Sequence, residues 1–378
     1  MLPMTILLLI VIVLFVLYAA LVLYYWRSWQ SVPVVELSNT SMPDYITTVS
    51  VIIPARNEQE NIDALLKALE RQTYPSLLLE IIVVDDHSTD NTAAIVKTFE
   101  NVTLVQLQDD NLNSYKKKAI EKGIAAATRE LIITTDADCI PPAKWIETLV
   151  AFKEKNNPVF IAAPVSINCN SSLLQLFQSM DFMVLQGITG AVVSKQQLTM
   201  CNGANLAYTK KAFEQVNGFA GIDHIASGDD MLLMYKIAKS FPGRVYYLKS
   251  PEAIVSTQPA LTWKAFFQQR IRWASKAGQY KDKRFFPVLL LVYLVNISFF
   301  LLLIAGFVNS VLWLWLLILL VFKTLVEFPL FISVARFFHK EWAIRLFLFF
   351  QPLHIFYTII SGLFGQFGKY EWKGRRVR

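Results

Sequence analysis

The chain has little charge, few cysteines and no glycine-rich phosphate loop. Only 17% of its 378 residues are charged, whereas 54% are hydrophobic. This balance is too apolar for a protein that is soluble throughout its length, so part of the chain is expected to lie in a membrane. The remaining length leaves room for one sizeable globular domain.

Each absence also excludes a class of chemistry. The three cysteines, Cys139, Cys169 and Cys201, have neither metal-ligand spacing nor the pattern of a disulfide framework, which indicates a reducing compartment. Without Gly-x-Gly-x-x-Gly or a Walker loop, dinucleotide and P-loop chemistry are not expected. The net charge of +7 could suggest a nucleic acid partner, but no nucleic-acid-binding signature is present.

The basic residues gather beside apolar segments, which is typical of a cytoplasmic membrane surface. They include Lys281, Lys283, Arg284, Lys373, Arg375, Arg376 and Arg378. Residues 1–26 carry no charge and are long enough for a spanning helix, with aromatic residues around Arg27. A cleaved signal peptide would have a basic start and a shorter apolar core, and this segment has neither. We predict a multi-pass protein of the cell (inner) membrane, with its main domain in the cytoplasm.

The C-terminal region is expected to contain further membrane helices. Residues 285–322 are uncharged and too long for one span, so they predict a helical hairpin, although Lys323 and Glu327 fall inside its second arm. Residues 342–365 either span the membrane or are re-entrant or interfacial, because a full span would export the basic tail against the positive-inside rule. Ahead of these segments, mixed aromatic and basic residues over 258–284 predict a helix in the membrane interface.

Between the apolar ends, strands and helices alternate, which predicts an α/β domain with a doubly wound, mostly parallel sheet. The predicted strands are Val49–Pro54, Glu80–Val84, Val102–Val105 and Leu131–Thr135, with Met200–Tyr208 a strand or loop. The first predicted helix begins near Asn57, where Asn57 and Glu60 are predicted to make a capping box. Four further helices are predicted over Asp90–Glu100, Lys116–Thr128, Ser171–Val193 and Asp229–Lys239. The predicted order is an anchor (1–29), a linker (30–47), the α/β domain (48–257), an interfacial helix (258–284) and a membrane region with a basic tail (285–378).

The β-branched strand Leu131–Thr135 ends abruptly in two carboxylates, Asp136 and Asp138. Ligands of open α/β sheets bind at the carboxyl ends of the strands, and two aspartates there offer hard oxygen ligands for Mg²⁺ or Mn²⁺. Such a pair alone is more often a turn or a helix cap. Two further polar clusters favour a ligand site over a turn or cap, because Ala55–Glu58 follows the first strand and Asp85–Asp86 follows the second. Three clusters in one register predict a metal-assisted nucleotide site.

Three other groups of residues are each compatible with two roles. The lysines Lys116–Lys118 either add positive charge near the site or are solvated on a helix surface. The pair Asp229–Asp230 opens a predicted helix, where an acid either caps the helix or removes a proton from a hydroxyl group. Gln269, Arg272 and Trp273 share one helical face, which suits a sugar or phosphate site, although an interfacial anchor explains this motif alone better.

Taken in order along the chain, these motifs resemble the membrane-bound family 2 glycosyltransferases, which include cellulose, hyaluronan and ceramide-glucoside synthases. The resemblance covers about residues 48–280. It rests on six ordered motifs, which are Val51–Glu58, Val83–Asp90, Asp136–Asp138, Asn202–Asn205, Gly228–Asp230 and Gln269–Trp273.

The resemblance implies a GT-A fold, a nucleotide sugar donor that is usually UDP-linked, Mg²⁺ or Mn²⁺, and inversion at the anomeric carbon. By this likeness the nucleotide sugar would be held by Ala55, Glu58, Asp85 or Asp86, and Asp136. We add Lys116 to this group. The metal would be bound by Asp136 and Asp138, and the acceptor and diphosphate side lined by Asn205, Gln269, Arg272 and Trp273. Asp230 would be the general base, with Asp229 as a helix cap or supporting acid.

Two features depart from the family. Asp229–Asp230 stands where Glu-Asp is usual, and the apparent spans are fewer than in the polysaccharide synthases. We therefore expect transfer of a sugar to a lipid or lipid-linked acceptor, with a processive exopolysaccharide synthase as the enzymatic alternative. A transport or scaffold protein with a degenerate nucleotide-binding domain is the remote alternative, since every acid that the chemistry needs is present.

Overall fold

The structure is a computed structural model that describes residues 2–37, 45–109, 112–170, 172–225, 228–275, 286–365, 370–372 and 375–377. The predicted basic cluster at Lys281–Arg284 and the end of the predicted interfacial helix lie outside the described residues. The chain forms two compact units. We call them the helical unit (Met1–Ser31, Asn170–Gly187 and Ala260–Val377) and the α/β unit (Val32–Cys169 and Ile188–Pro259).

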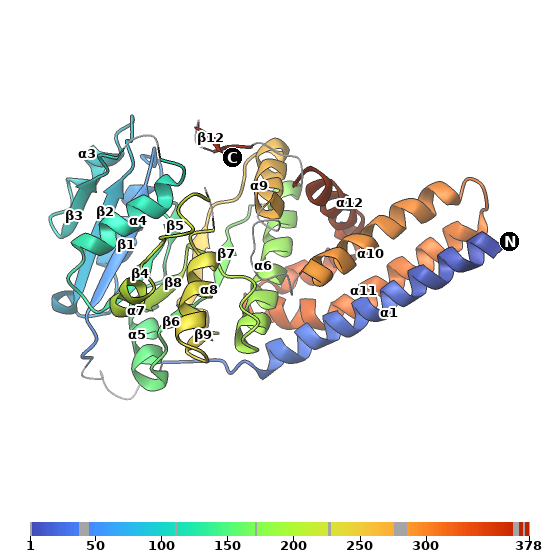
Figure 1. The fold of residues 1–378 in the computed structure, drawn as a ribbon, viewed down its shortest axis with the longest axis horizontal. Coiled ribbons are helices and arrows are strands. Elements are labelled where there is room, and N and C mark those ends of the chain that lie inside the picture. The colour runs from blue at the N-terminus through green and yellow to red at the C-terminus, as the bar shows by residue number, and fades with distance from the viewer. Residues whose placement is uncertain are drawn as a thin grey trace. The chain divides into compact units, whose positions relative to one another are not determined.

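The α/β unit is built on a seven-stranded sheet with the order β3-β2-β1-β4-β8-β6-β9, labelled in Figure 1. The strands are β1 (Val49–Ala55), β2 (Leu79–Asp85), β3 (Val102–Gln106), β4 (Leu131–Thr134), β6 (Phe160–Ala162), β8 (Leu206–Thr209) and β9 (Val245–Tyr247). The first four run parallel to one another, whereas β8 is antiparallel to β4 and to β6. A small second sheet joins β5 (Cys139–Ile140), β10 (Val255–Thr257) and β7 (Val165–Ile167). The predicted doubly wound, mostly parallel sheet is confirmed.

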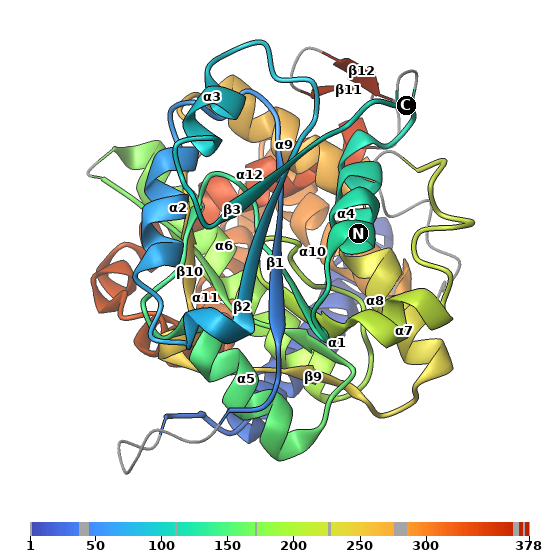
Figure 2. The same ribbon diagram turned by 90° about the vertical axis from the view of Figure 1, so that its left-hand side faces the viewer.

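Helices cover both faces of the parallel strands, which explains why these strands are apolar throughout. Figure 2 shows α2 (Ile62–Glu70) and α4 (Tyr115–Ala126) on opposite sides of β1 and β2. The approach of α4 requires a glycine, because a Cβ atom at Gly123 would lie 2.5 Å from Cγ2 of Ile52. Since α4 connects the parallel strands β3 and β4, its first turn lies at the carboxyl edge of the sheet.

Two helix starts differ from the prediction because side chains there bind the backbone of other loops. Asn57 has a φ of 51° and accepts a hydrogen bond from the Thr89 amide at 2.9 Å, so α2 begins only after Asn61, without the predicted capping box. Asp90 accepts a hydrogen bond from the Gln59 amide at 3.1 Å, and α3 is short (Thr92–Val96). The remaining helices of this unit are α5 (Trp145–Asn156), α7 (Lys210–Gln215) and α8 (Met231–Ser240), with 3₁₀ turns η1 (Ser76–Leu78) and η2 (Pro251–Ala253).

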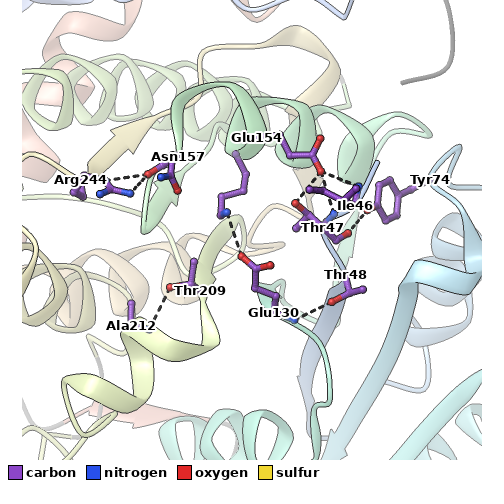
Figure 3. A network of polar contacts seen from close by, with 11 residues as sticks. Ile46, Thr47, Thr48, Tyr74, Glu130, Glu154, Asn157, Thr209, Ala212 and Arg244 are labelled. Atoms are coloured by element: carbon purple, nitrogen blue, oxygen red, sulfur yellow. Dashed lines mark hydrogen bonds and ion pairs between the residues drawn. The ribbon is translucent and has the colours of Figure 1, made fainter. Parts of the chain in front are cut away.

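Figure 3 shows a network of polar contacts at the amino ends of β1 and β4. One carboxylate oxygen of Glu154 on α5 accepts hydrogen bonds from the amides of Ile46 and Thr47 at 3.1 and 3.0 Å. The Glu130 amide donates to Thr48 Oγ1 at 3.1 Å, immediately before the two strands begin. These contacts fix the strands at the edge opposite to the predicted site.

The helical unit contains α1 (Leu2–Ser31), most of α6 (Leu173–Ser194), α9 (Trp263–Ser275), α10 (Phe286–Ala305), α11 (Val311–Phe337) and α12 (Phe347–Gly365). A 3₁₀ turn, η5 (Glu341–Arg345), precedes α12, and β11 (Tyr370–Trp372) pairs with β12 (Arg375–Val377). By length and composition, α1, α6, α10, α11 and α12 could each cross a membrane. The predicted N-terminal helix and C-terminal hairpin are confirmed. The segment that sequence left undecided (342–365) forms the end of η5 followed by the helix α12.

The two charged residues inside the second arm of the hairpin belong to a polar cluster of three helices. Lys323 is fully buried on α11, and its Nζ lies 2.7 Å from Oε1 of Glu327 and 2.7 Å from Oε1 of Gln351 on α12. Gln351 also donates to Glu327 Oε2 at 2.6 Å, and Tyr18 of α1 donates to the same carboxylate. Mutual pairing lets both charges lie within an apolar helix bundle.

Candidate functional site

The polar segments that follow β1, β2 and β4 meet at one edge of the α/β unit. Ala55 pairs in register with Asp85, and the Asp86 amide donates to the Ala55 carbonyl at 2.8 Å. On the other side of β1, Ile52 pairs with Thr134, the last residue of β4. The three clusters therefore stand side by side, in the arrangement that parallel strands give to ligand sites.

Asp85 and Asp86 are both buried, and the protein itself uses part of each carboxylate. Asp85 accepts a hydrogen bond from the Ser88 amide at 3.3 Å, which shapes the turn after β2. Oδ1 of Asp86 lies 3.0 Å from His87 Nδ1 and 3.8 Å from Arg56 Nη1. The charge of Asp86 is thus balanced within the loops, close to the place predicted for a nucleoside.

Glu58 lies at the rim of the same edge and is partly exposed. Its amide donates to Thr92 Oγ1 at 2.8 Å, and its Oε2 accepts from Asn61 Nδ2 at 2.8 Å. These two contacts connect the loop after β1 to the starts of α2 and α3. The predicted nucleotide-binding residues of β1 and β2 are therefore held in one connected loop layer.

The centre of the edge is occupied by one lysine between two aspartates. Nζ of Lys116, in the first turn of α4, lies 2.6 Å from Oδ1 of Asp136 and 3.2 Å from Oδ2 of Asp229. Burial alone would lower the pKa of Lys116, but the charges of Asp136 and Asp229 outweigh it and raise that pKa well above its usual range. Lys116 is therefore a permanent cation, and it joins residues that are widely separated in sequence.

Gly203 brings the backbone against this cluster. A Cβ atom at Gly203 would lie 3.2 Å from Asp229 Oδ2 and 3.3 Å from Lys116 Nζ, which is closer than such atoms normally stand. Its carbonyl accepts a hydrogen bond from Thr134 Oγ1 at 3.4 Å, which connects the segment to the end of β4. Sequence placed Gly203 in a motif but gave it no role, because the need for a missing side chain appears only in three dimensions.

Replacing Gly203 by Ala should disturb the ion pair without disturbing the fold. The added methyl group must displace Asp229 or Lys116 by a few tenths of an ångström, and we expect roughly a tenfold loss of turnover, since small misplacements at reacting groups are costly. Steady-state kinetics and a thermal melt check this. Full activity of Gly203→Ala at an unchanged melting temperature would show that the geometry of this cluster is unimportant.

The structure corrects the prediction for the acid pair that precedes α8. Asp230, not Asp229, is the helix cap, and its Oδ1 accepts a hydrogen bond from the Met231 amide at 2.7 Å. Asp229 instead pairs with Lys116. The two consecutive side chains point in different directions, as the sequence predicted. A helix cap was one of the two roles predicted for Asp229, and in the structure Asp230 is the cap.

Asp136 and Asp138 fit a divalent cation that completes its coordination with substrate oxygens. Both side chains are partly exposed, and both offer the hard oxygens that Mg²⁺ and Mn²⁺ prefer. Among the described residues, no group of three or more His, Cys, Asp or Glu side chains could bind a metal ion together. A magnesium-type site with one or two carboxylates plus phosphate oxygens needs no such group.

Asn205, predicted on the acceptor and diphosphate side, is a core residue. Its side chain is fully buried, and its Oδ1 accepts from Trp145 Nε1 at 2.9 Å. Its amide nitrogen donates to the carbonyls of Pro164 and Ala253, each at 2.8 Å. With both amide hydrogens used by the backbone, Asn205 supports the loops around β7 and η2 and has no donor left for a substrate.

Gln269, Arg272 and Trp273 lie on α9 of the helical unit, in the helical spacing that the sequence predicted. Sequence did not single out Arg270, which is buried and pairs through Nη2 with Asp181 Oδ2 of α6 at 2.7 Å. Its guanidinium covers the Trp273 ring at 4.3 Å from the centroid. One face of that indole is therefore occupied by a cation, and the roles predicted for this motif stay predictions.

The mixed, mostly parallel sheet of the α/β unit has the GT-A fold that the resemblance implied. The fold is similar to that of a solved structure, the mannosyltransferase PcManGT from Pyrobaculum calidifontis in complex with GDP-Man and Mn²⁺. The TM-score is 0.58 at 23% sequence identity, over 94% of this chain and 99% of that one. Residues 50–216, which lie in the α/β unit and in α6, match the family model of glycosyl transferase family 2.

Two curated relatives illustrate the range of the family. The poly-beta-1,6-N-acetyl-D-glucosamine synthase of Staphylococcus epidermidis is 26% identical over 249 residues, which cover 64% of this chain and 57% of that protein. The undecaprenyl-phosphate 4-deoxy-4-formamido-L-arabinose transferase of Yersinia pestis is 34% identical over 160 residues, which cover 40% of this chain and 46% of that protein. The chain thus spans about half the length of the curated relatives that it matches.

Proposed function

We propose that the chain is a membrane-bound inverting glycosyltransferase that moves one sugar from a UDP-sugar to a lipid or lipid-linked acceptor. The observation that carries the proposal is the Lys116 cluster, in which one cation joins Asp136 after β4 to Asp229 before α8. A leaving diphosphate is stabilised by positive charge, and an acceptor hydroxyl needs a base that removes its proton. The cluster holds a cation, Lys116, beside carboxylates.

In the proposed donor complex, the loops after β1 and β2 hold the nucleoside, and the Lys116 ammonium donates to the diphosphate while it keeps its pair with Asp229. Asp136 and Asp138 would bind Mg²⁺ or Mn²⁺, which supplies neutralisation of the charge that develops on the leaving diphosphate. Asp230 would take the proton of the acceptor hydroxyl, because Asp229 is already neutralised by Lys116. The hydroxyl oxygen then bonds to C1 as the C1–O bond to the diphosphate breaks, which inverts the anomeric carbon.

The apolar helices and one relative favour a lipid acceptor in this proposal. Helices long and apolar enough to cross a bilayer stand at both ends of the described chain, and the Yersinia pestis relative is named for transfer involving undecaprenyl phosphate. We further propose that the protein is a multi-pass protein of the inner membrane. The α/β unit would face the cytoplasm, where nucleotide sugars are made.

A polysaccharide acceptor is the second candidate. The Staphylococcus epidermidis relative is named as a synthase of a sugar polymer, and its match covers more of this chain than does the Yersinia pestis match. In that case each transfer would extend a growing chain, and the products would form a ladder of sizes.

Labelled nucleotide sugars offered to sealed membrane vesicles test the proposal. Inside-out vesicles containing the protein should incorporate label from one UDP-sugar into a lipid-extractable product of one size, whereas right-side-out vesicles should not. Vesicles from cells lacking the protein provide the control. A ladder of polymer would favour the second candidate, and no incorporation from any nucleotide sugar would refute both.

A further inference from the structure

Lys117 is buried in the α/β unit although it stands between two lysines that are partly exposed. Only 1% of its surface is accessible, whereas the side chains of Lys116 and Lys118 are 23% and 34% exposed. A buried ammonium is costly unless hydrogen bonds compensate the loss of water, so its contacts must explain its position.

Two of the contacts of Lys117 are with backbone carbonyls of the segment between α7 and α8. Its Nζ donates to the oxygen of Ile222 at 2.8 Å and to the oxygen of Ile225 at 2.5 Å. Hydrogen bonds from an ammonium to carbonyls are charge-assisted and therefore stronger than those between neutral groups. One side chain of α4 thus contacts two points of the segment, whose residues 216–225 are turns and bends in the structure.

Other side chains secure the beginning of the same segment. Lys236 of α8 donates to the carbonyls of Gly218 and Ala220 at 2.5 and 2.8 Å. Glu121, one helical turn after Lys117 on α4, accepts from the Phe219 amide at 3.3 Å. Of these three side chains, Lys117 contacts the residue nearest in sequence to the acid pair, since Ile225 precedes Asp229 by four residues.

The first turn of α4 therefore contacts the middle of this segment through Lys117 and its end through Lys116. Neighbouring residues on a helix point about 100° apart, so Lys117 can face the carbonyls while Lys116 faces the carboxylates. Lys116 Nζ lies 3.2 Å from Asp229 Oδ2, and the two lysines share one rigid helical turn. Since Ile225 lies four residues before Asp229, a shift at Ile225 is expected to move Asp229 relative to Lys116 and, with it, the neighbouring Asp230.

We propose that Lys117 is a positioning residue for glycosyl transfer, which sets the acid pair against the Lys116–Asp136 side of the site. The inference rests on the proposed function, in which Asp230 takes the acceptor proton. Lys117 itself touches no substrate, and its effect passes through the backbone at Ile222 and Ile225. The alternative is that Lys117 only stabilises the folded unit.

The test is a double-mutant cycle between Lys117→Met and Asp230→Asn in the full-length membrane protein. Met keeps the length of the side chain but removes its donors, and positioning predicts a fall in kcat of roughly 10- to 100-fold with an unchanged donor KM. In the Asp230→Asn background the same change should lower kcat by less than about twofold, because the base that Lys117 positions is already absent. Lys122→Met is the matched control, since Lys122 is exposed on the same helix and pairs with Asp109 at 3.5 Å.

A purely structural role predicts a different result. Lys117→Met would then reduce the yield and thermal stability, while kcat per folded molecule stayed the same or fell equally in both backgrounds, and either outcome overturns the proposal. If the Met variant does not fold, Lys117→Arg enters the same cycle, because it keeps the donors but displaces them. No turnover by the wild-type protein would refute the proposed function as well, whereas an additive effect with normal wild-type turnover refutes only the role of Lys117.

Discussion

Replacing Asp138 by Asn should abolish sugar transfer while the protein still folds and inserts. Asp138 and Asp136 supply the hard oxygens that we assign to the divalent cation, and an amide is a far weaker ligand than a carboxylate. A metal at a diphosphate contributes several kcal/mol to the stability of the charged transition state, so turnover should fall on the order of 10³-fold or more. Steady-state assays in vesicles, normalised to the amount of folded protein, measure this loss.

A matched substitution on the surface separates this effect from a general loss of carboxylates. Asp63 pairs with Lys67 at 2.8 Å on α2, and both side chains are well exposed, so Asp63→Asn should keep full activity. EDTA should inactivate the wild-type protein, and added Mg²⁺ or Mn²⁺ should restore it. Substantial activity of Asp138→Asn, or full activity in excess chelator, would contradict the metal assignment.

Replacing Asp230 by Asn should lower kcat by roughly 10²- to 10⁴-fold, which is the usual contribution of a general base. The structure makes this substitution selective. Asp230 caps α8 through Oδ1, and Asn is an equally good helix cap, so only the proton-accepting carboxylate is lost. Donor affinity should stay within a few-fold of that of the wild-type protein, because we assign the nucleoside contacts to the loops after β1 and β2.

Asp229→Asn should give a different pattern of kinetic change. This substitution removes the charge that pairs with Lys116, so it should weaken donor binding and reduce kcat less than Asp230→Asn does. Comparing kcat and donor KM for the two variants decides the assignment. An inactive Asp229→Asn beside an active Asp230→Asn would reverse the roles of the two acids.

The parallel core was predictable because its strands have a simple physical signature. Strands covered on both faces become continuous apolar runs, and β1, β2 and β4 are read directly from such runs. The meeting of their polar ends was predictable for the same reason, since parallel strands align their carboxyl ends. The short α3 and the late start of α2 were not, because Asp90 and Asn57 bind the amides of Gln59 and Thr89, which local sequence does not reveal.

The finer arrangement of the candidate site depends on contacts between distant residues. In sequence, Lys116 and Lys117 are equivalent members of one basic run, yet one faces Asp136 and the other is buried against Ile222. Asn205 lies within a motif, but its side chain is used by Trp145 and two carbonyls far along the chain. Periodicity can place a residue on an element, but it cannot say which neighbour will use its polar atoms.

Binding of a nucleoside diphosphate to the purified full-length protein tests the central claim most directly, because it requires neither the sugar nor the acceptor to be known. Calorimetric titration with UDP should show saturable binding in Mn²⁺ or Mg²⁺, weaker binding in EDTA, and equally weak binding by Asp138→Asn in either condition. Absence of binding for both UDP and GDP in the presence of the metal would contradict a nucleotide-sugar site at the carboxyl edge of this sheet.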